Sequence, residues 1–212
     1  MYVYTVDMTT ATKDTKMKNL TIAVDLDGTS FDYEGGLREF VGALHGISSE
    51  ELLVRYPVAA DYVMGNNGWF NMDTQEKFYE LHSQAVEDGL FEKLVPYEGV
   101  SEALWDFHRQ GHFIRIVTAR FLKAGDRYRV VESTARSLDN AHIPVDDIAF
   151  TARKTEVIAD VYIDDAPQNI VELTAAGRTV IIFDQPYNQG YEGLRAKNWD
   201  DVTRIVNELA QG

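Results

Sequence analysis

The chain has 212 residues, a mass of 24.0 kDa and a formal net charge of −14 from 20 Lys+Arg and 34 Asp+Glu. This length suits one domain, with or without an insertion, and 45% hydrophobic residues exclude a chain that is mostly disordered. The acidic balance disfavours a nucleic acid polymer as partner, because its phosphates would be repelled on average. The absence of cysteine excludes disulfides, thiolate catalysis and cysteine-ligated metals, and it fits a cytoplasmic location.

The first 19 residues are polar and rich in threonine, and they lack the apolar run of a secretory signal. We expect residues 1–19 to form a disordered tail. No later stretch reaches the roughly 18 consecutive apolar residues of a transmembrane helix, so we expect no membrane partner. From Leu20 the sequence changes to LTIAVD, a β-branched apolar run that predicts a buried strand.

Four further apolar runs predict strands at residues 112–118, 147–151, 160–164 and 178–184. Amphipathic patterns predict helices at residues 100–110, 127–141, 167–176 and 199–210. Strands that alternate with helices favour parallel pairing. We therefore expect an α/β fold, a Rossmann-like parallel sheet with helices on both faces and a ligand site at the carboxyl ends of the strands.

One interval interrupts this alternation, because residues 33–96 are mostly helical in pattern and contain no convincing buried strand. The predicted helices there cover residues 36–46, 49–56 and 74–89, and residues 64–70 form a loop. We interpret residues 33–96 as a helical cap that is inserted into an α/β core of residues 20–32 and 97–212.

The strongest local signal is the sequence DLDGT at residues 25–29, which directly follows the first predicted strand. Asp25 and Asp27 would point the same way only if the strand continued, and Gly28 indicates that the chain turns. One carboxylate can then attack phosphorus as a nucleophile, while the other acts as acid and base. For an isolated D-x-D, an Asp-rich turn that caps a helix is an equally good explanation.

Two further strand ends carry groups that suit an anion. Thr118 ends the second predicted strand, where its hydroxyl can bind a phosphate oxygen, or alternatively cap a helix. Arg120 follows as a candidate anion clamp. Arg153 and Lys154 follow the third strand, either as a cationic pair beside a negative centre or as a solvated basic turn.

The fourth predicted strand ends in Asp164 and Asp165, whose hard carboxylates suit Mg²⁺. Acid, hydroxyl, cation and acid thus occur at four successive strand ends, which predicts one site for phosphate and metal. Asp146 and Asp147 form another acid pair, but they precede their strand. We expect that pair to lie at the opposite end of the sheet in a structural role.

The residues DLDGT at 25–29, Thr118, Lys154 and Asp164-Asp165 resemble the four motifs of the haloacid dehalogenase-like phosphohydrolases, from about Leu20 to the last strand. The resemblance implies that Asp25 forms an aspartyl-phosphate, and that Asp27 protonates the leaving group and then activates water. It also implies that Mg²⁺ is bound by Asp25, by the backbone carbonyl of Asp27 and by a late aspartate, Asp165 or Asp164.

The chain also resembles the 5′(3′)-deoxyribonucleotidases. The features that carry this likeness are DYEGG at 32–36, the helical insertion there, Trp69-Phe70, Phe91 ahead of PYEG at 96–99, and the run from 154 to 165. Two positions depart from that family. Ala119 stands where serine is usual, and Arg153 directly precedes Lys154, whereas the family's arginine lies one position earlier. The resemblance implies hydrolysis of (deoxy)nucleoside monophosphates to nucleoside and phosphate, and a homodimer.

Three aromatic residues are candidates to enclose a nucleobase: Trp69 and Phe70, which can instead simply pack the cap, and Phe31 as part of a pocket floor. With Ala119, Arg120 and Arg153 they form the expected substrate-binding set. Two other functions stay open. One is a phosphatase of another small ester, such as a sugar phosphate or phosphoglycolate. The other is a non-catalytic module that binds Mg²⁺ and phosphate, although such a module has no need of Asp27.

Overall fold

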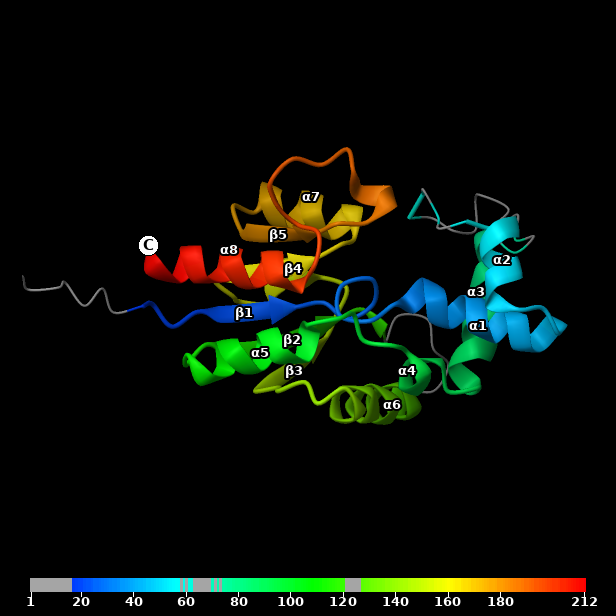
Figure 1. Cartoon of the computed structure of the whole chain (residues 1–212). Helices are drawn as coiled ribbons and strands as arrows, with labels where there is room; N and C mark the ends of the chain where they lie inside the picture. The colour runs from blue at the N-terminus through cyan, green and yellow to red at the C-terminus, as the bar shows by residue number, and fades with distance from the viewer. Residues whose placement is uncertain are drawn as a thin grey trace, which may run out of the picture.

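The structure is a computed structural model that describes residues 17–57, 59, 61–62, 70, 72, 74–120 and 127–212. It has an α/β fold built on a six-stranded sheet in the order β3-β2-β1-β4-β5-β6, in which every neighbouring pair is parallel (Figure 1). The strands are β1 (Thr21–Val24), β2 (Phe113–Thr118), β3 (Asp147–Phe150), β4 (Val161–Asp164), β5 (Thr179–Phe183) and β6 (Leu194–Ala196). The Rossmann-like sheet that the sequence predicted is thereby confirmed.

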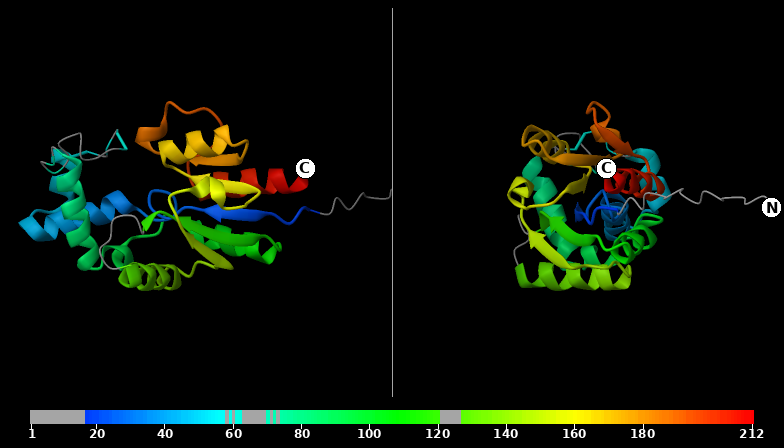
Figure 2. Two further views of the ribbon diagram at one scale, coloured as in Figure 1. Left: turned by 180° about the vertical axis from the view of Figure 1, so that it is seen from behind. Right: turned by 90° about the vertical axis from the view of Figure 1, so that its left-hand side faces the viewer.

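Helices lie on both faces of the sheet, with α7 on one face and α5 and α8 on the other (Figure 2). The α-helices are α1 (Tyr33–His45), α2 (Ser49–Arg55), α3 (Gln75–Glu87), α4 (Leu90–Lys93), α5 (Val100–Arg109), α6 (Arg127–Asn140), α7 (Pro167–Ala175) and α8 (Trp199–Gln211). Two short 3-10 helices are η4 (Lys154–Glu156) and η5 (Pro186–Asn188).

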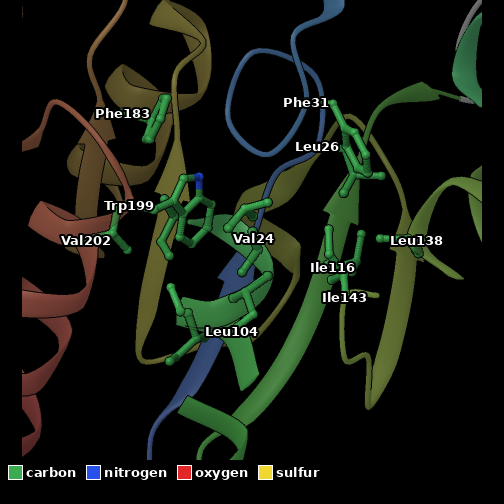
Figure 3. Packing of buried hydrophobic residues seen from close by; sticks show 14 of the residues in the cluster. Val24, Leu26, Phe31, Leu104, Ile116, Leu138, Ile143, Phe183, Trp199 and Val202 are labelled. Atoms are coloured by element: carbon green, nitrogen blue, oxygen red, sulfur yellow. The ribbon is translucent and has the colours of Figure 1, made fainter. Parts of the chain in front are cut away.

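The alternation of side chains along the strands divides the buried apolar residues into two clusters. In β1, Ile22 and Val24 belong to the larger cluster, whereas Ala23 belongs to the smaller one on the opposite face. In Figure 3, Trp199 of α8 lies with Val24 and Leu104 of α5 in the larger cluster. Burial of each large apolar side chain stabilises the fold by about 1.5–3 kcal/mol, so these clusters fix the strand ends that carry the site.

Helices α1, α2 and α3 lie beyond the carboxyl end of β1, away from the body of the sheet (Figure 1). Helix α1 begins at Tyr33, three residues earlier than predicted, because the Asp32 side chain caps it by accepting the Gly35 N–H at 2.9 Å. Glycine has a low helix propensity, but a Cβ at Gly36 would lie 2.4 Å from Leu94 Cδ2, so any larger residue there would force the Leu94 side chain to shift. The division into a core and an inserted cap stays a proposal.

Four elements of the described residues have no counterpart among the predicted ones, namely α4, β6, η4 and η5. Helix α4 and strand β6 have four and three residues, too few for a periodic pattern. Residues 1–16 of the predicted tail and 64–69 of the predicted loop lie outside the described residues. Among the residues that the structure describes, no helix combines the length and the apolar character needed to cross a membrane.

Candidate active site

The candidate site lies at the carboxyl ends of β1, β2 and β4, where the strand order reverses between β1 and β4. Parallel α/β sheets form their ligand crevice at such a switch point. A cavity of about 910 Å³ lies there and is lined by side chains from four predicted strand ends: Asp25, Asp27, Thr118, Lys154 and Asp165. The structure therefore brings the separate sequence motifs together, as the sequence predicted.

Lys154 joins two of the acidic side chains. Its Nζ lies 2.6 Å from Asp25 Oδ1 and 2.6 Å from Asp164 Oδ2, and the residue is only 3% exposed. Burial by itself would lower the pKa of Lys154, but the neighbouring Asp164 and Asp25 raise it above its usual value. Lys154 therefore carries a positive charge at the floor of the cavity.

Asp25 is held in a strongly negative environment. Burial raises the pKa of Asp25 well above its usual value, and Asp164 and Asp165 raise it further, whereas Lys154 lowers it. Oxygens of Asp25, Asp164 and Asp165 all lie within 4.8 Å of one another, and all three residues are buried. Three carboxylates facing one ammonium group leave an excess of negative charge that favours a cation.

The two adjacent aspartates of β4 and the following loop have different surroundings. Asp164 does not line the cavity, and its oxygens accept hydrogen bonds from Lys154, from the Ala166 N–H at 3.0 Å and from Asn169 Nδ2 at 3.0 and 3.1 Å. Asp164 thus orients Lys154 and the start of α7.

Asp165, in contrast, lines the cavity, and it accepts hydrogen bonds from Thr29 Oγ1 at 2.7 Å and from the Tyr187 hydroxyl. Burial and the neighbouring Asp164 raise the pKa of Asp165 to about 7. Gly28 is needed beside it, because the backbone has φ +84° there and a Cβ would lie 2.5 Å from Asp165 Oδ2.

Asp27 is separate from this cluster of three carboxylates. Its side chain pairs with Arg120, whose Nη2 lies 2.6 Å from Asp27 Oδ1. A side-chain role for Asp27 in metal binding therefore has no support in this geometry, which leaves the backbone carbonyl that the family resemblance implies. Arg120 lines the cavity as well, but its guanidinium is paired with Asp27, and its role as a clamp for the substrate phosphate stays a prediction.

Thr118 and Ala119 both line the cavity at the end of β2. Thr118 is buried, and its Oγ1 accepts the backbone N–H of Arg120 at 3.3 Å. The hydroxyl hydrogen stays available to an anion in the cavity, because this bond uses the oxygen as acceptor. The Thr118 hydroxyl can therefore accept a backbone N–H and still donate its own hydrogen to a phosphate oxygen, so the two roles considered for Thr118 are compatible.

Arg153 does not line the cavity, so its part in the expected Arg153-Lys154 pair at the site stays a prediction. Its side chain is 77% exposed and pairs with Glu156 at 3.2 Å. The reason is local: Lys154 begins the 3-10 helix η4 and Arg153 precedes it, so successive side chains point in different directions.

Two of the three aromatic candidates, Phe31 and Phe70, are described by the structure, and neither lines the cavity. Phe31 does not line the cavity but is fully buried in the larger apolar cluster, with the Arg120 guanidinium 5.6 Å from its ring. Phe70 packs edge-on against Tyr56 at 5.3 Å, which is the cap-packing alternative. Trp69 lies outside the described residues, so its predicted role stays a prediction.

Sequence reasoning missed the wall that helices α1 and α3 supply to the cavity, which includes Tyr33, Gln75, Phe78 and His82. On an amphipathic helix such residues are usually interpreted as ordinary packing, and of the four only Tyr33 lies in a quoted motif, DYEGG at 32–36. Tyr187 was also missed, because its place beside Asp165 depends on the loop after β5. The acid pair Asp146-Asp147 lies at the amino end of the sheet, as the sequence predicted. Asp146 accepts the Ile114 N–H, and Asp147 accepts a hydrogen bond from Arg115.

Comparison with solved structures identifies the fold. A haloacid dehalogenase-like hydrolase of Streptococcus pneumoniae superposes with a TM-score of 0.56 at 13% identity, covering 89% of this chain and 98% of that chain. A hydrolase of Pseudomonas syringae gives a TM-score of 0.53 at 16% identity, with coverage of 92% and 99%. At these identities the likeness concerns the fold alone.

Comparison of sequences is more specific. The model of the family described as "5' nucleotidase, deoxy (Pyrimidine), cytosolic type C protein" matches residues 19–211. A protein of Chlorobaculum tepidum named "Putative 5'(3')-deoxyribonucleotidase" is 31% identical over 198 residues, which cover 92% of this chain and 95% of that protein. The chain therefore belongs to this deoxyribonucleotidase family and is a phosphoric monoester hydrolase.

Proposed function

We propose that the protein is a Mg²⁺-dependent deoxyribonucleotidase that hydrolyses nucleoside monophosphates to nucleoside and phosphate through an aspartyl-phosphate on Asp25. The observation that carries the proposal is the buried arrangement of Asp25, Lys154 and Asp165 on the cavity wall. This arrangement supports the proposal, because it brings an ammonium group and two carboxylates together on the wall of one cavity.

The donor atoms fit a magnesium ion, which prefers a few carboxylate oxygens and keeps water or substrate oxygens as its other ligands. Asp25 and Asp165 would hold the ion, because both line the cavity, whereas Asp164 is engaged by Lys154, Ala166 and Asn169. When bound, the ion supplies positive charge that offsets the charge of the carboxylates and of the phosphate dianion.

In the first half of the reaction, a carboxylate oxygen of Asp25 attacks phosphorus and the bond from phosphorus to the nucleoside oxygen breaks. Asp27 gives that oxygen a proton. In the second half, water attacks the phosphorus of the aspartyl-phosphate, Asp27 accepts its proton, and phosphate leaves with Asp25 restored. Lys154 offsets negative charge on the phosphate, and the Thr118 hydroxyl donates a hydrogen bond to it.

The substrate class follows from the family description and from the relative's name, which together favour pyrimidine deoxynucleoside monophosphates. A cavity of about 910 Å³ is near the upper end of the range for small-molecule sites, so it has room beyond a phosphate group. The cytoplasmic location is also part of this proposal and is in line with the word "cytosolic" in the family description. The homodimer stays a prediction from the resemblance.

The test is phosphate release from a panel of ribo- and deoxyribonucleoside monophosphates and sugar phosphates, with Mg²⁺ and with EDTA. Asp25→Asn is expected to abolish release while its thermal unfolding stays cooperative, and Asp146→Asn at the other end of the sheet serves as the matched control. Activity that persists in Asp25→Asn would exclude this nucleophile. If the wild-type protein prefers sugar phosphates, the result favours a phosphatase of another small ester. If it hydrolyses none of the substrates, the result favours the non-catalytic module that binds Mg²⁺ and phosphate.

A further inference from the structure

The cavity continues from the carboxylates of the sheet to the helices that follow β1, and aromatic rings form part of its wall there. Tyr33, Phe78 and His82 all line it. The Tyr33 hydroxyl lies 2.7 Å from His82 Nδ1, and the rings of Phe78 and His82 stack with centroids 6.2 Å apart and an interplanar angle of 19°. These rings give the part of the cavity wall that α1 and α3 supply flat surfaces that suit a planar ring.

Gln75 lines the same cavity. It is the first residue of α3, directly after Thr74, whose side chain caps the helix by accepting the Lys77 N–H. The Oε1 atom of Gln75 is buried and has no hydrogen-bond partner among the residues that the structure describes. A buried carbonyl oxygen without a donor is unfavourable, so this position favours a ligand with an N–H group.

Neighbouring carboxylates on the same wall have their partners within the protein. Glu34 accepts hydrogen bonds from Arg38 Nη2 at 2.6 Å and from the Ala59 N–H, and Asp32 accepts the N–H of Gly35. These acceptors are already satisfied by the fold. The Gln75 amide is therefore the better candidate to read a ligand by hydrogen bonding.

Resting on the nucleotidase function proposed above, we propose that Gln75 accepts a hydrogen bond from an N–H group of the nucleobase and thereby favours nucleotides over phosphate esters without a base. Ring or amino N–H groups are present on the pairing edge of each common nucleobase, and a sugar phosphate has none. Discrimination of this kind is effective because a substrate that lacks the group leaves the buried acceptor unpaired.

The experiment measures kcat and KM for two substrates: the deoxynucleoside 5′-monophosphate that the wild type hydrolyses best, and 2-deoxyribose 5-phosphate, which has no base. The variants are Gln75→Met, which keeps the length of the side chain without its amide, and Gln84→Met as the matched control on the exposed side of the same helix. Thermal unfolding checks that each variant is folded. If Gln75→Met unfolds, Gln75→Asn replaces it with the same expectation.

We expect Gln75→Met to lower kcat/KM for the nucleotide roughly three- to tenfold, mainly through KM, and to leave the base-free substrate and the Gln84→Met control within about twofold. An equal loss on both substrates, or no loss on the nucleotide, overturns the role of Gln75 while wild-type nucleotidase activity upholds the proposed function. A wild type that hydrolyses 2-deoxyribose 5-phosphate but no nucleotide overturns both.

Discussion

Arg120 and Asp27 form a two-point ion pair at the edge of the cavity: Nη2 of Arg120 lies 2.6 Å from Asp27 Oδ1, and its Nε lies 3.0 Å from both carboxylate oxygens. The Arg120 side chain is fully buried, with its guanidinium 4.3 Å from the ring of Phe91. Its Nη1 donates to the hydroxyls of Thr134 and Ser137 at 3.4 and 3.3 Å. Arg120 therefore fixes the orientation of Asp27 from within the protein.

The first prediction concerns this pair. Arg120→Lys removes the two-point geometry, because an ammonium group cannot match both carboxylate oxygens as a guanidinium does. We expect kcat to fall roughly tenfold or more with little change in KM, because in the proposed mechanism Asp27 acts on the leaving group and not in binding. Loss of the charge-assisted hydrogen bonds is also expected to lower the free energy of unfolding by about 2 kcal/mol.

Steady-state kinetics and thermal unfolding of Arg120→Lys check this prediction. A rise in KM at constant kcat would contradict it. That result would instead restore the role of substrate clamp that the sequence indicated for Arg120.

The second prediction compares two adjacent cations. Lys154→Met leaves Asp25 and Asp164 buried without their counter-charge, and we expect kcat/KM to fall by roughly 100-fold or more together with a loss of stability. Arg153→Met removes only an exposed pair with Glu156, so we expect its activity to stay within about twofold of the wild type. Phosphate-release assays on both variants measure the contrast, and similar losses in the two would show that Arg153 reaches the substrate.

The third prediction concerns pH and metal. The pKa of Asp165 is about 7 in the folded protein, above its ordinary value of 3.8. Between these values the folded state binds more protons than the unfolded state, so this group's contribution to stability is present at low pH and lost as the pH rises to about 7. In the proposed function Mg²⁺ would bind the ionised carboxylate of Asp165 and so would compete with the proton.

We expect Mg²⁺ to raise the melting temperature over EDTA-treated protein more at about pH 8 than at about pH 5.5. Thermal unfolding at both pH values, with and without the ion, measures this difference. Asp165→Asn is the control, in which the effect of Mg²⁺ should be largely lost at both pH values. An equal effect of Mg²⁺ in the wild type and in Asp165→Asn would place the ion elsewhere.

Much of the fold and of the site was determined by the sequence alone. Asp25, Thr118, Lys154 and Asp165 each lie at or just after the end of an apolar strand pattern. Parallel strands present their carboxyl ends on one edge, so local patterns were enough to predict that these residues converge. The short strand β6 was not predictable in this way, because three residues carry no periodicity.

Only the tertiary structure decided which partner each charged group takes. Arg120 and Asp27 are 93 positions apart, and nothing local to either residue predicts their ion pair. Likewise, Asp164 accepts a hydrogen bond from Lys154 whereas Asp165 lines the cavity, although the two aspartates are adjacent in the sequence. The physical reason is that secondary structure follows from local side-chain patterns, whereas pairing and burial of charges depend on contacts that form only when distant segments pack together.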